Sequence, residues 1–231
     1  MNPSNSVSTT DLARSPLFAT LDEQHLVELL KEHRLVRLQP NQTFVFDQEE
    51  AEGLMQMRSG MAKVRCFSRD GEEVVLSLLG AGDVFGELAM LCGGRRTADV
   101  VSLTDCEVLK LSRSSIHRLL HREPLLGIAL ATVLSRRQLQ LGHRYALRWA
   151  DATTRLLATL LDLALHIDVD APPTAVIPPL TVGELANLSG MARETASRTL
   201  SKLRQRGTVE AVEGGGLKIA DLESLQRRDL L

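Results

Sequence analysis

The sequence predicts an α+β fold: an N-terminal antiparallel β-roll of the jelly-roll kind with flanking helices, then a long helix and a C-terminal domain of short helices. Three observations carry this prediction. Between Leu35 and Leu111, apolar residues alternate at period two and glycine turns recur at close intervals, which is typical of short antiparallel strands. From Ser112 to Trp149 the apolar spacing becomes helical. Beyond Asp151, helical segments alternate with turn residues and end in a glycine-rich hairpin.

The domain boundaries follow from these changes of pattern. We expect a flexible tail at residues 1–10, an effector-type β-domain at 11–123, a long helix at 124–150 and a C-terminal domain at 151–231. Within the β-domain, Asp22 is placed to begin a helix. Asp70-Gly71 between two apolar segments is the strongest hairpin signal.

The composition is that of a globular protein with a slight acidic excess. Of the 231 residues, 44% are hydrophobic, which is enough for a sizeable core. The formal net charge is -2, so any nucleic-acid contact must come from a local basic patch. The three cysteines (Cys66, Cys92 and Cys106) are far apart, and we expect buried thiols in a reducing cytosol rather than a disulfide framework or a metal site. The N-terminus lacks the pattern of a signal peptide and no apolar run could span a bilayer, so we expect a cytoplasmic protein without membrane contact.

A short helical segment interrupts the strands at Phe85–Leu91 and is followed by Gly93-Gly-Arg-Arg-Thr97. The carboxylate of Glu87, the glycine N–H groups and the guanidinium of Arg96 together predict an anion-binding cradle, because arginine can bind a phosphate through two parallel hydrogen bonds. An alternative stays open at this point, in which Arg96 is structural and pairs with Glu87.

The long helix begins at Pro124, a residue favoured in the first turn of a helix. Its apolar stripe, with Arg136 and Arg137 lying off it, indicates a seam between two subunits. Packing of the same stripe on the chain's own β-domain is the alternative. The stripe consists of Leu126, Leu130, Val133, Leu134, Leu141 and Tyr145.

The C-terminal domain has the layout of a winged helix-turn-helix. Asp151 is placed to cap a helix that runs to Leu165. After an acidic, proline-containing loop, Thr181-Val-Gly-Glu184 is a capping box that opens a short helix. Gly190 then turns the chain into a second helix. Two further strands around Gly214-Gly-Gly216 form the wing, and Asp221 is placed to cap a last short helix.

The second helix of this pair, Met191–Arg206, has two different faces. Its apolar residues (Ala196, Leu200 and Leu203) gather on one side. The opposite side carries groups suited to base edges, since arginine donors fit guanine and a carboxylate fits the cytosine amino group. A solvated amphipathic helix is the alternative, and the surrounding helix-turn-helix layout argues against it. The base-facing residues are Arg193, Glu194, Ser197 and Arg198, and Lys202, Arg204 and Arg206 follow where phosphates would lie.

The order of these motifs resembles the Crp/Fnr family of bacterial transcription regulators over nearly the whole chain. Segments similar to the family's cyclic-nucleotide-binding β-roll are Met57-Arg-Ser-Gly60, Asp70-Gly71, Gly80-Ala-Gly-Asp83 and Phe85-Gly-Glu87. Val182–Leu203 is similar to its winged helix-turn-helix. The resemblance implies a homodimer joined along the helix after Pro124, a hinge at Asp151, a palindromic operator in double-stranded DNA, and RNA polymerase as a further partner.

The resemblance also implies which residues form the two sites. The implied effector-binding residues are Gly86, Glu87, Leu88, Arg96 and Thr97. The implied DNA-binding residues are Thr181, Arg193, Glu194, Thr195, Ser197, Arg198 and Lys202. The pattern Glu194, Ser197, Arg198 is similar to the Fnr side of the family, which reads TTGAT-type half-sites, whereas Arg193 is shared with the Crp side, which reads TGTGA. The sequence does not choose between these two types of half-site.

Three departures from the family pattern narrow the expectations. Ala192 stands where the family has a helix-capping Ser or Thr, which costs about 1 kcal/mol of cap stabilisation. Leu141-Gly-His143 lacks the hydroxyl residues that hold the purine in cyclic-AMP receptors, which argues against cyclic AMP although another cyclic nucleotide stays open. The segment before Leu35 has no cysteine, so no iron–sulfur cluster is expected.

Other functions are weighed against a ligand-controlled DNA-binding regulator. A nucleotide-sensing module that acts through a protein partner, and a regulator that needs no effector, both stay open. An enzyme is not expected, because no catalytic constellation stands out in the sequence.

Overall fold

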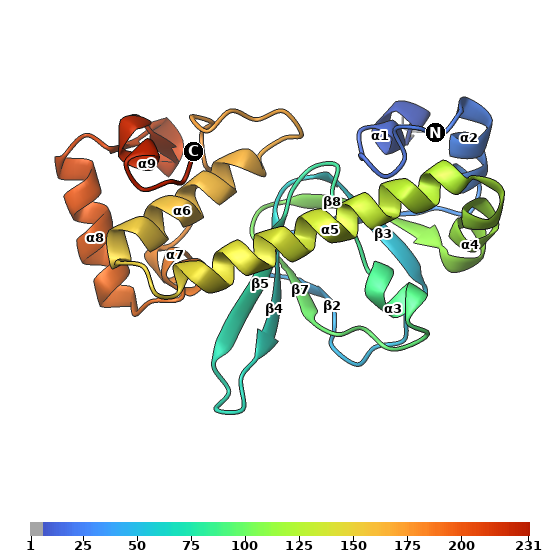
Figure 1. The fold of residues 1–231 in the computed structure, drawn as a ribbon, viewed down its shortest axis with the longest axis horizontal. Coiled ribbons are helices and arrows are strands. Elements are labelled where there is room, and N and C mark those ends of the chain that lie inside the picture. Colours follow the sequence, from blue (N-terminus) through green and yellow to red (C-terminus); the bar gives the residue numbers. More distant parts are fainter. Residues whose placement is uncertain (1–6) are drawn as a thin grey trace. The chain divides into compact units, whose positions relative to one another are not determined.

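The computed structural model describes residues 7–231. The chain divides into two compact units, one formed by the residues up to Val64 and from Leu79 to Leu139, the other by Arg65–Leu78 and Gln140–Leu231. Figure 1 labels most of the elements. Up to the long helix they are α1 (Thr9–Ala13), α2 (Glu23–Leu30), β1 (Arg34–Leu38), β2 (Thr43–Val45), β3 (Gly53–Ser59), β4 (Ala62–Phe67), β5 (Glu73–Leu79), β6 (Val84–Phe85), α3 (Glu87–Leu91), β7 (Asp99–Ser102), β8 (Cys106–Ser112), α4 (Arg113–Arg122) and α5 (Pro124–Leu147).

The strands form two four-stranded sheets, in the orders β1-β8-β3-β6 and β2-β7-β4-β5. The pairings of β1 with β8, of β2 with β7, and of β3 with β6 and β8 are antiparallel. Between β3 and β8, Leu54 lies opposite Leu111 and Gln56 lies opposite Leu109. Gly71 adopts a φ of 79° in the turn between β4 and β5, where the sequence predicts the hairpin. The predicted antiparallel β-roll is confirmed.

The first core cluster explains why helices flank this roll. Leu54 and Leu109 of the β1-β8-β3-β6 sheet pack with Phe18 and Leu29 from the N-terminal segment. Leu126 and Leu130 of α5 are buried in the same cluster, and Val133 and Leu134 pack against it. The assignment of these four α5 residues to a subunit seam is therefore wrong, because this face of α5 covers the chain's own sheet. Leu141 and Tyr145 from the same predicted stripe are exposed.

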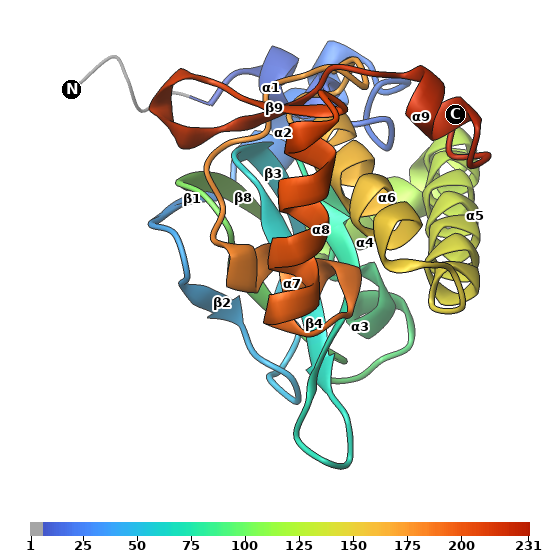
Figure 2. The ribbon, with the colours of Figure 1, turned by 90° about the vertical axis from the view of Figure 1, so that its left-hand side faces the viewer.

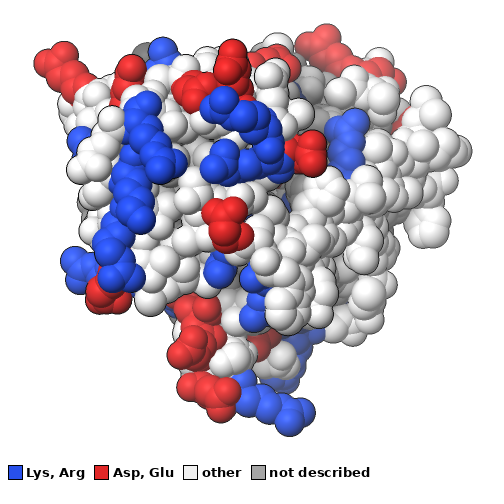
Figure 3. Space-filling view, turned by 60° about the vertical axis from the view of Figure 1, so that its left-hand side comes forward, with Lys and Arg blue, Asp and Glu red and all other residues white. Residues whose placement is uncertain are grey.

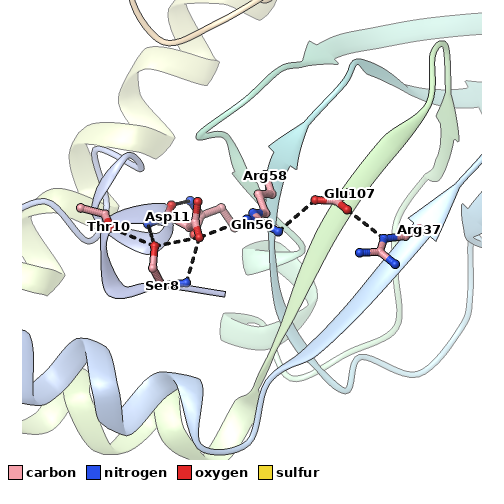
Figure 4. Close-up of polar contacts among 7 residues, drawn as sticks. All are labelled: Ser8, Thr10, Asp11, Arg37, Gln56, Arg58 and Glu107. Carbon is pink, nitrogen blue, oxygen red and sulfur yellow. Dashed lines mark hydrogen bonds and ion pairs between the residues drawn. The ribbon is translucent and has the colours of Figure 1, made fainter. Parts of the chain in front are cut away.

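A row of polar contacts fixes α1 to the sheet (Figure 4). Ser8 caps α1 together with the side chain of Asp11. Asp11 pairs with Arg58 of β3 at 3.4 Å, and Arg58 pairs with Glu107 of β8 at 3.0 Å. Glu107 accepts a further bond of 2.9 Å from Arg37 of β1. Of the predicted tail, residues 1–6 lie outside the described residues, whereas Thr9 and Thr10 belong to α1.

The second unit contains the predicted winged helix-turn-helix (Figure 2). Asp151 caps the first of its helices by accepting backbone bonds from Thr153 and Thr154, and Thr181 caps the next by accepting one from Glu184 at 3.1 Å. Gly190 ends that helix in the left-handed conformation, which glycine adopts without steric cost. The elements are α6 (Ala152–Leu165), α7 (Val182–Ser189), α8 (Arg193–Gln205), β9 (Val209–Ala211), β10 (Leu217–Ile219) and α9 (Glu223–Gln226), with a 3₁₀ turn at Glu213–Gly215.

The end of α5 is tied to α6 by a cluster of charged groups. Arg144 donates to Asp162 Oδ2 at 2.5 Å, and His166 Nδ1 lies 3.2 Å from Asp162 Oδ1. Burial raises the pKa of Asp162, but the hydrogen bond from His166 and the charges of His166 and Arg144 outweigh it and lower that pKa to about 2. The ionised carboxylate therefore stabilises this unit.

A pH-dependent loss of stability follows from this cluster. The folded pKa of Asp162, about 2, lies below the ordinary value of 3.8, so its contribution is complete above about pH 5 and is lost as the pH falls through about 2. Near pH 7 we expect Asp162→Asn to lower the free energy of unfolding by about 1–2 kcal/mol. In urea unfolding at a series of pH values, the difference from the wild type should shrink between about pH 5 and pH 2. Asp170→Asn, at an exposed position in the following loop, is the control; a pH-independent effect of Asp162→Asn would contradict the argument.

Candidate effector cradle and DNA-reading helix

The cradle predicted between β6 and β7 is built on Gly86 and Arg96. Arg96 donates from Nη1 to the carbonyl of Gly86 and from Nη2 to the carbonyl of Gly53, both at 3.0 Å. Gly86 has a φ of 87°, and a Cβ there would lie 2.2 Å from Arg96 Nη1. Only glycine therefore permits both the backbone conformation and the close approach of the guanidinium.

Arg96 is 5% exposed, and nearby carboxylates favour its charged form. Burial lowers the pKa of Arg96, while the negative charges of Glu49, Glu87 and Glu52 oppose that shift. Two of the five N–H donors of the guanidinium are used by the carbonyls. The remaining donors are available to an oxyanion.

Glu87 is held by the long helix. Its side chain is 4% exposed and accepts a bond of 2.6 Å from Arg137 Nη1, while Arg137 Nη2 donates to the carbonyl of Val84. The alternative in which Arg96 pairs with Glu87 is not found among the described residues, where Glu87 pairs with Arg137 and Arg96 binds carbonyls. In the sequence, Arg137 only lies off the apolar stripe of the long helix, and no local pattern shows which carboxylate it reaches.

The other implied effector residues lie at the surface of this region. Leu88 is 49% exposed, so the structure places it at the rim and not in the buried part with Glu87 and Arg96. Thr97 is exposed, directly after Arg96. The cradle thus has a buried floor of two charged side chains and a more open edge.

The predicted DNA-reading helix, α8, has its two faces separated as expected. Ala196, Leu200 and Leu203 are buried. The described part of α8 exposes the implied DNA-binding residues except Thr195, which is half-buried, and Thr181 is also exposed. Figure 3 shows basic side chains in a band over the region of α8. Ala192 occupies the N-cap and contributes no side-chain hydrogen bond.

An arginine that the sequence interpretation missed holds the helix-turn-helix turn in place. Arg155 of α6 donates from Nε to the carbonyl of Ser189 at 3.0 Å and from Nη2 to the carbonyl of Gly190. A Cβ at Gly190 would lie 3.1 Å from Arg155 Nη2. Arg155 therefore sets the spacing between α6 and the turn that orients α8. Its position four residues after Asp151 gives no local signal for this role.

The face of α5 opposite its buried stripe is exposed and regularly spaced. Exposed residues recur at alternating intervals of three and four, which is the spacing of the contact positions in a two-stranded coiled coil. The apolar members Leu125, Ile128 and Leu139 are 59%, 62% and 65% exposed. The full set in α5 is Leu125, Ile128, Thr132, Ser135, Leu139, Gly142 and Ala146.

The cysteines form no common site. Cys106 is buried as expected, but Cys66 is half-buried and Cys92 is exposed, so the expectation of three buried thiols is wrong for Cys92. Over residues 7–231, no group of three His, Cys, Asp or Glu side chains is arranged to hold a metal ion. No helix in that range is long and apolar enough to cross a membrane.

Comparison with known proteins agrees with this geometry. Residues 35–123 match the cyclic nucleotide-binding domain, and residues 154–228 match the Crp-like helix-turn-helix domain. The cyclic AMP receptor protein of Thermus thermophilus is 35% identical over 87% of this chain and 90% of that protein. The chain belongs to the Crp/Fnr family of transcriptional regulators.

Further relatives span nearly the full length of this family member. The CRP-like cAMP-activated global transcriptional regulator of Mycobacterium tuberculosis is 29% identical over 94% of this chain and 97% of that protein. The c-di-GMP responsive global regulator CLP of Xanthomonas campestris shares the fold, with a TM-score of 0.69 at 24% identity over 87% of this chain and all of that one. The chain is therefore a DNA-binding transcriptional regulator with a cyclic nucleotide-binding domain.

The pair formed by Glu87 and Arg137 can be tested through stability. Arg137→Met leaves the buried carboxylate without its partner. We expect it to lower the free energy of unfolding by about 2–3 kcal/mol, somewhat less than for a fully buried pair because Arg137 is 23% exposed. Adding Glu87→Gln should recover at least about 1 kcal/mol, because the amide carries no buried charge. Urea unfolding measures both, with Arg136→Met on the exposed side of α5 as the control. Equal losses for Arg136→Met and Arg137→Met would contradict the pairing.

Proposed function

We propose that this regulator binds a palindromic DNA site as a homodimer, with α8 of each subunit in the major groove. The observation that carries the proposal is the exposed polar face of α8 directly after the helix-turn-helix turn. On this face, Arg193 and Arg198 supply donors for guanine, and Glu194 supplies an acceptor for the cytosine amino group. Thr181 and Lys202 are the proposed phosphate contacts, and Thr195 and Ser197 support the base-reading residues.

The proposed homodimer forms along the exposed coiled-coil positions of α5. Ile128 and Leu139 would pack against the same residues of a second copy, as a two-fold interface requires. Two copies of α8 would then read half-sites about 34 Å apart, one turn of DNA. RNA polymerase is the further partner that a transcriptional regulator of this family implies.

The proposed effector is a cyclic nucleotide bound in the cradle. The free donors of Arg96, with the Thr97 hydroxyl, suit a cyclic phosphate, and the Glu87 carboxylate suits a ribose hydroxyl. Such a hydroxyl would compete with Arg137 for Glu87, so binding would act on α5. For this to change DNA binding, the effector must bind the DNA-competent state more tightly than the other.

The second candidate function is a regulator that needs no effector, and the ion pair between Arg137 and Glu87 favours it. Arg137 already satisfies the Glu87 carboxylate at 2.6 Å. In that case the ion pair would hold the cradle closed permanently, and nucleotides would have no effect on DNA binding.

DNA reading by α8 is tested by replacing Glu194 and Arg198 together with alanine. Because each base contact of this kind is worth about 1–3 kcal/mol, specific affinity should fall at least about 30-fold while non-specific binding remains. Gel shifts on palindromes of TTGAT and TGTGA half-sites would measure the loss, choose between the sites and show two chains bound per palindrome. The matched control, Glu23→Ala with Arg122→Ala, removes the same charges from exposed positions far along the chain. Unchanged affinity in the Glu194/Arg198 variant would contradict the proposal.

The effector is tested by calorimetric titration of the protein with cyclic AMP, cyclic GMP and cyclic di-GMP. We expect one of them to bind, and Thr97→Val and Arg96→Ala to weaken that binding, because both remove a phosphate contact. Thr97 is exposed, so its replacement keeps the test valid if the Arg96 variant fails to fold. Absence of binding by all three would rule out these cyclic nucleotides and favour the regulator without an effector.

A further inference from the structure

The second unit contains a cavity that DNA reading by the exposed face of α8 does not use. Its volume is about 340 Å³, within the range of small-molecule sites. The buried side chains of Leu157 and Leu203 line its apolar part. The polar lining comes from the start of α6, from both sides of the wing, and from α9 with the residues after it: Thr153, Arg206, Thr208, Asp221, Ser224, Arg227 and Arg228.

The side chains of this lining carry more positive than negative charges. Three arginines face one carboxylate, Asp221. Asp221 Oδ1 accepts backbone bonds from Glu223 at 3.0 Å and Ser224 at 3.3 Å, and Oδ2 accepts the Ser224 hydroxyl. The hydrogen bond from that hydroxyl lowers the pKa of Asp221, so its negative charge is used in capping α9. Arg227 also pairs with Glu223 at 3.9 Å, and the charge of Arg228 adds to the backbone hydrogen bond from Thr154 in lowering the pKa of Asp151. Within residues 7–231, Arg206 is therefore the lining cation without a nearby carboxylate.

The arginines keep donors free. Arg227 contacts Asp221 at 3.5 Å and the Ser224 hydroxyl at 3.2 Å. Arg228 donates from Nη1 to the Ser224 carbonyl at 3.1 Å, while its Nε is buried and has no hydrogen-bond partner among residues 7–231. Within the same range, the Arg206 side chain makes no hydrogen bond or ion pair. An unpaired buried donor costs free energy that a bound acceptor would recover.

We propose that this cavity binds a phosphate group. A phosphate accepts more hydrogen bonds at once than a carboxylate, so it can use the free donors of Arg206 and Arg228 together. Arg206 and Arg228 donate to it, and the hydroxyls of Thr153 and Thr208 lie in the same lining. The phosphate comes either from a solute or from the backbone of DNA beside the operator. The DNA source rests on the proposed DNA binding, and the solute source does not.

The first arm of the test uses the full chain without DNA. Inorganic phosphate and pyrophosphate are titrated into the protein by calorimetry at fixed ionic strength. The wild type and Arg122→Gln, which removes the same charge from an exposed position on α4, should bind alike. Arg206→Gln and Arg228→Gln should bind at least about tenfold more weakly. Arg206 is exposed and its side chain makes no hydrogen bond or ion pair within residues 7–231, so its variant should fold even if the Arg228 variant does not, which circular dichroism would check.

The second arm measures DNA affinity against salt concentration. One lost phosphate contact reduces the slope of log affinity against log salt by about 0.9. A reduced slope in Arg206→Gln, without binding of free phosphate, identifies the DNA backbone as the source. Phosphate binding that the two arginine variants weaken identifies a solute site, even if the protein binds no DNA. The proposal is overturned if neither quantity changes, or if free phosphate binds the wild type and both variants equally.

Discussion

The ion pair between Glu87 and Arg137 is the contact on which the effector cradle and the long helix both depend. A carboxylate as deeply buried as Glu87 is costly unless a cation compensates it, and that cation comes from a residue 50 positions further along the chain. The position of α5 against β6 and the ionisation of the cradle are therefore set together. In the proposed effector complex, a ligand hydroxyl at Glu87 would compete with Arg137, and this competition would connect the cradle to α5.

The second unit resolves an apparent conflict in the composition. The chain as a whole has a net charge of -2, which by itself does not attract DNA. In the second unit, Asp151, Asp162 and Asp221 are engaged in hydrogen bonds and ion pairs within the chain. The exposed face of α8 presents its cations, Arg193, Arg198 and Lys202, to solvent, and Figure 3 shows basic side chains in a band over this region. Affinity for DNA therefore depends on which charged side chains are exposed at the binding face, and not on the net charge of the chain.

The sequence predicts a structural feature correctly where that feature depends on contacts within a few residues. The caps at Asp22, Asp151 and Thr181 are of this kind, because each joins a side chain to a backbone N–H two or three positions away. The contacts of Arg137 with Glu87 and of Arg155 with the Ser189 carbonyl span 50 and 34 positions. Sequence periodicity does not show which distant residue such an arginine contacts. The base-reading and effector-binding residues stay predictions, since they concern ligands.

The two faces of α5 show where periodicity alone fails, and why a second copy of the chain is the natural occupant of the outer face. Leu126 and Leu130 meet the inner core, while Leu125 and Ile128, one or two positions away, remain exposed. Both sets satisfy helical spacing, so the sequence shows apolar stripes without showing which one is already covered. In the proposed dimer the outer row buries its large apolar residues, but Thr132, Ser135 and Gly142 lie between them. Small and hydroxyl-bearing side chains contribute little packing free energy. Such an interface would hold the two helices together, but shifting one helix against the other would cost little free energy. A change of contact at Glu87 could then alter the orientation of α8.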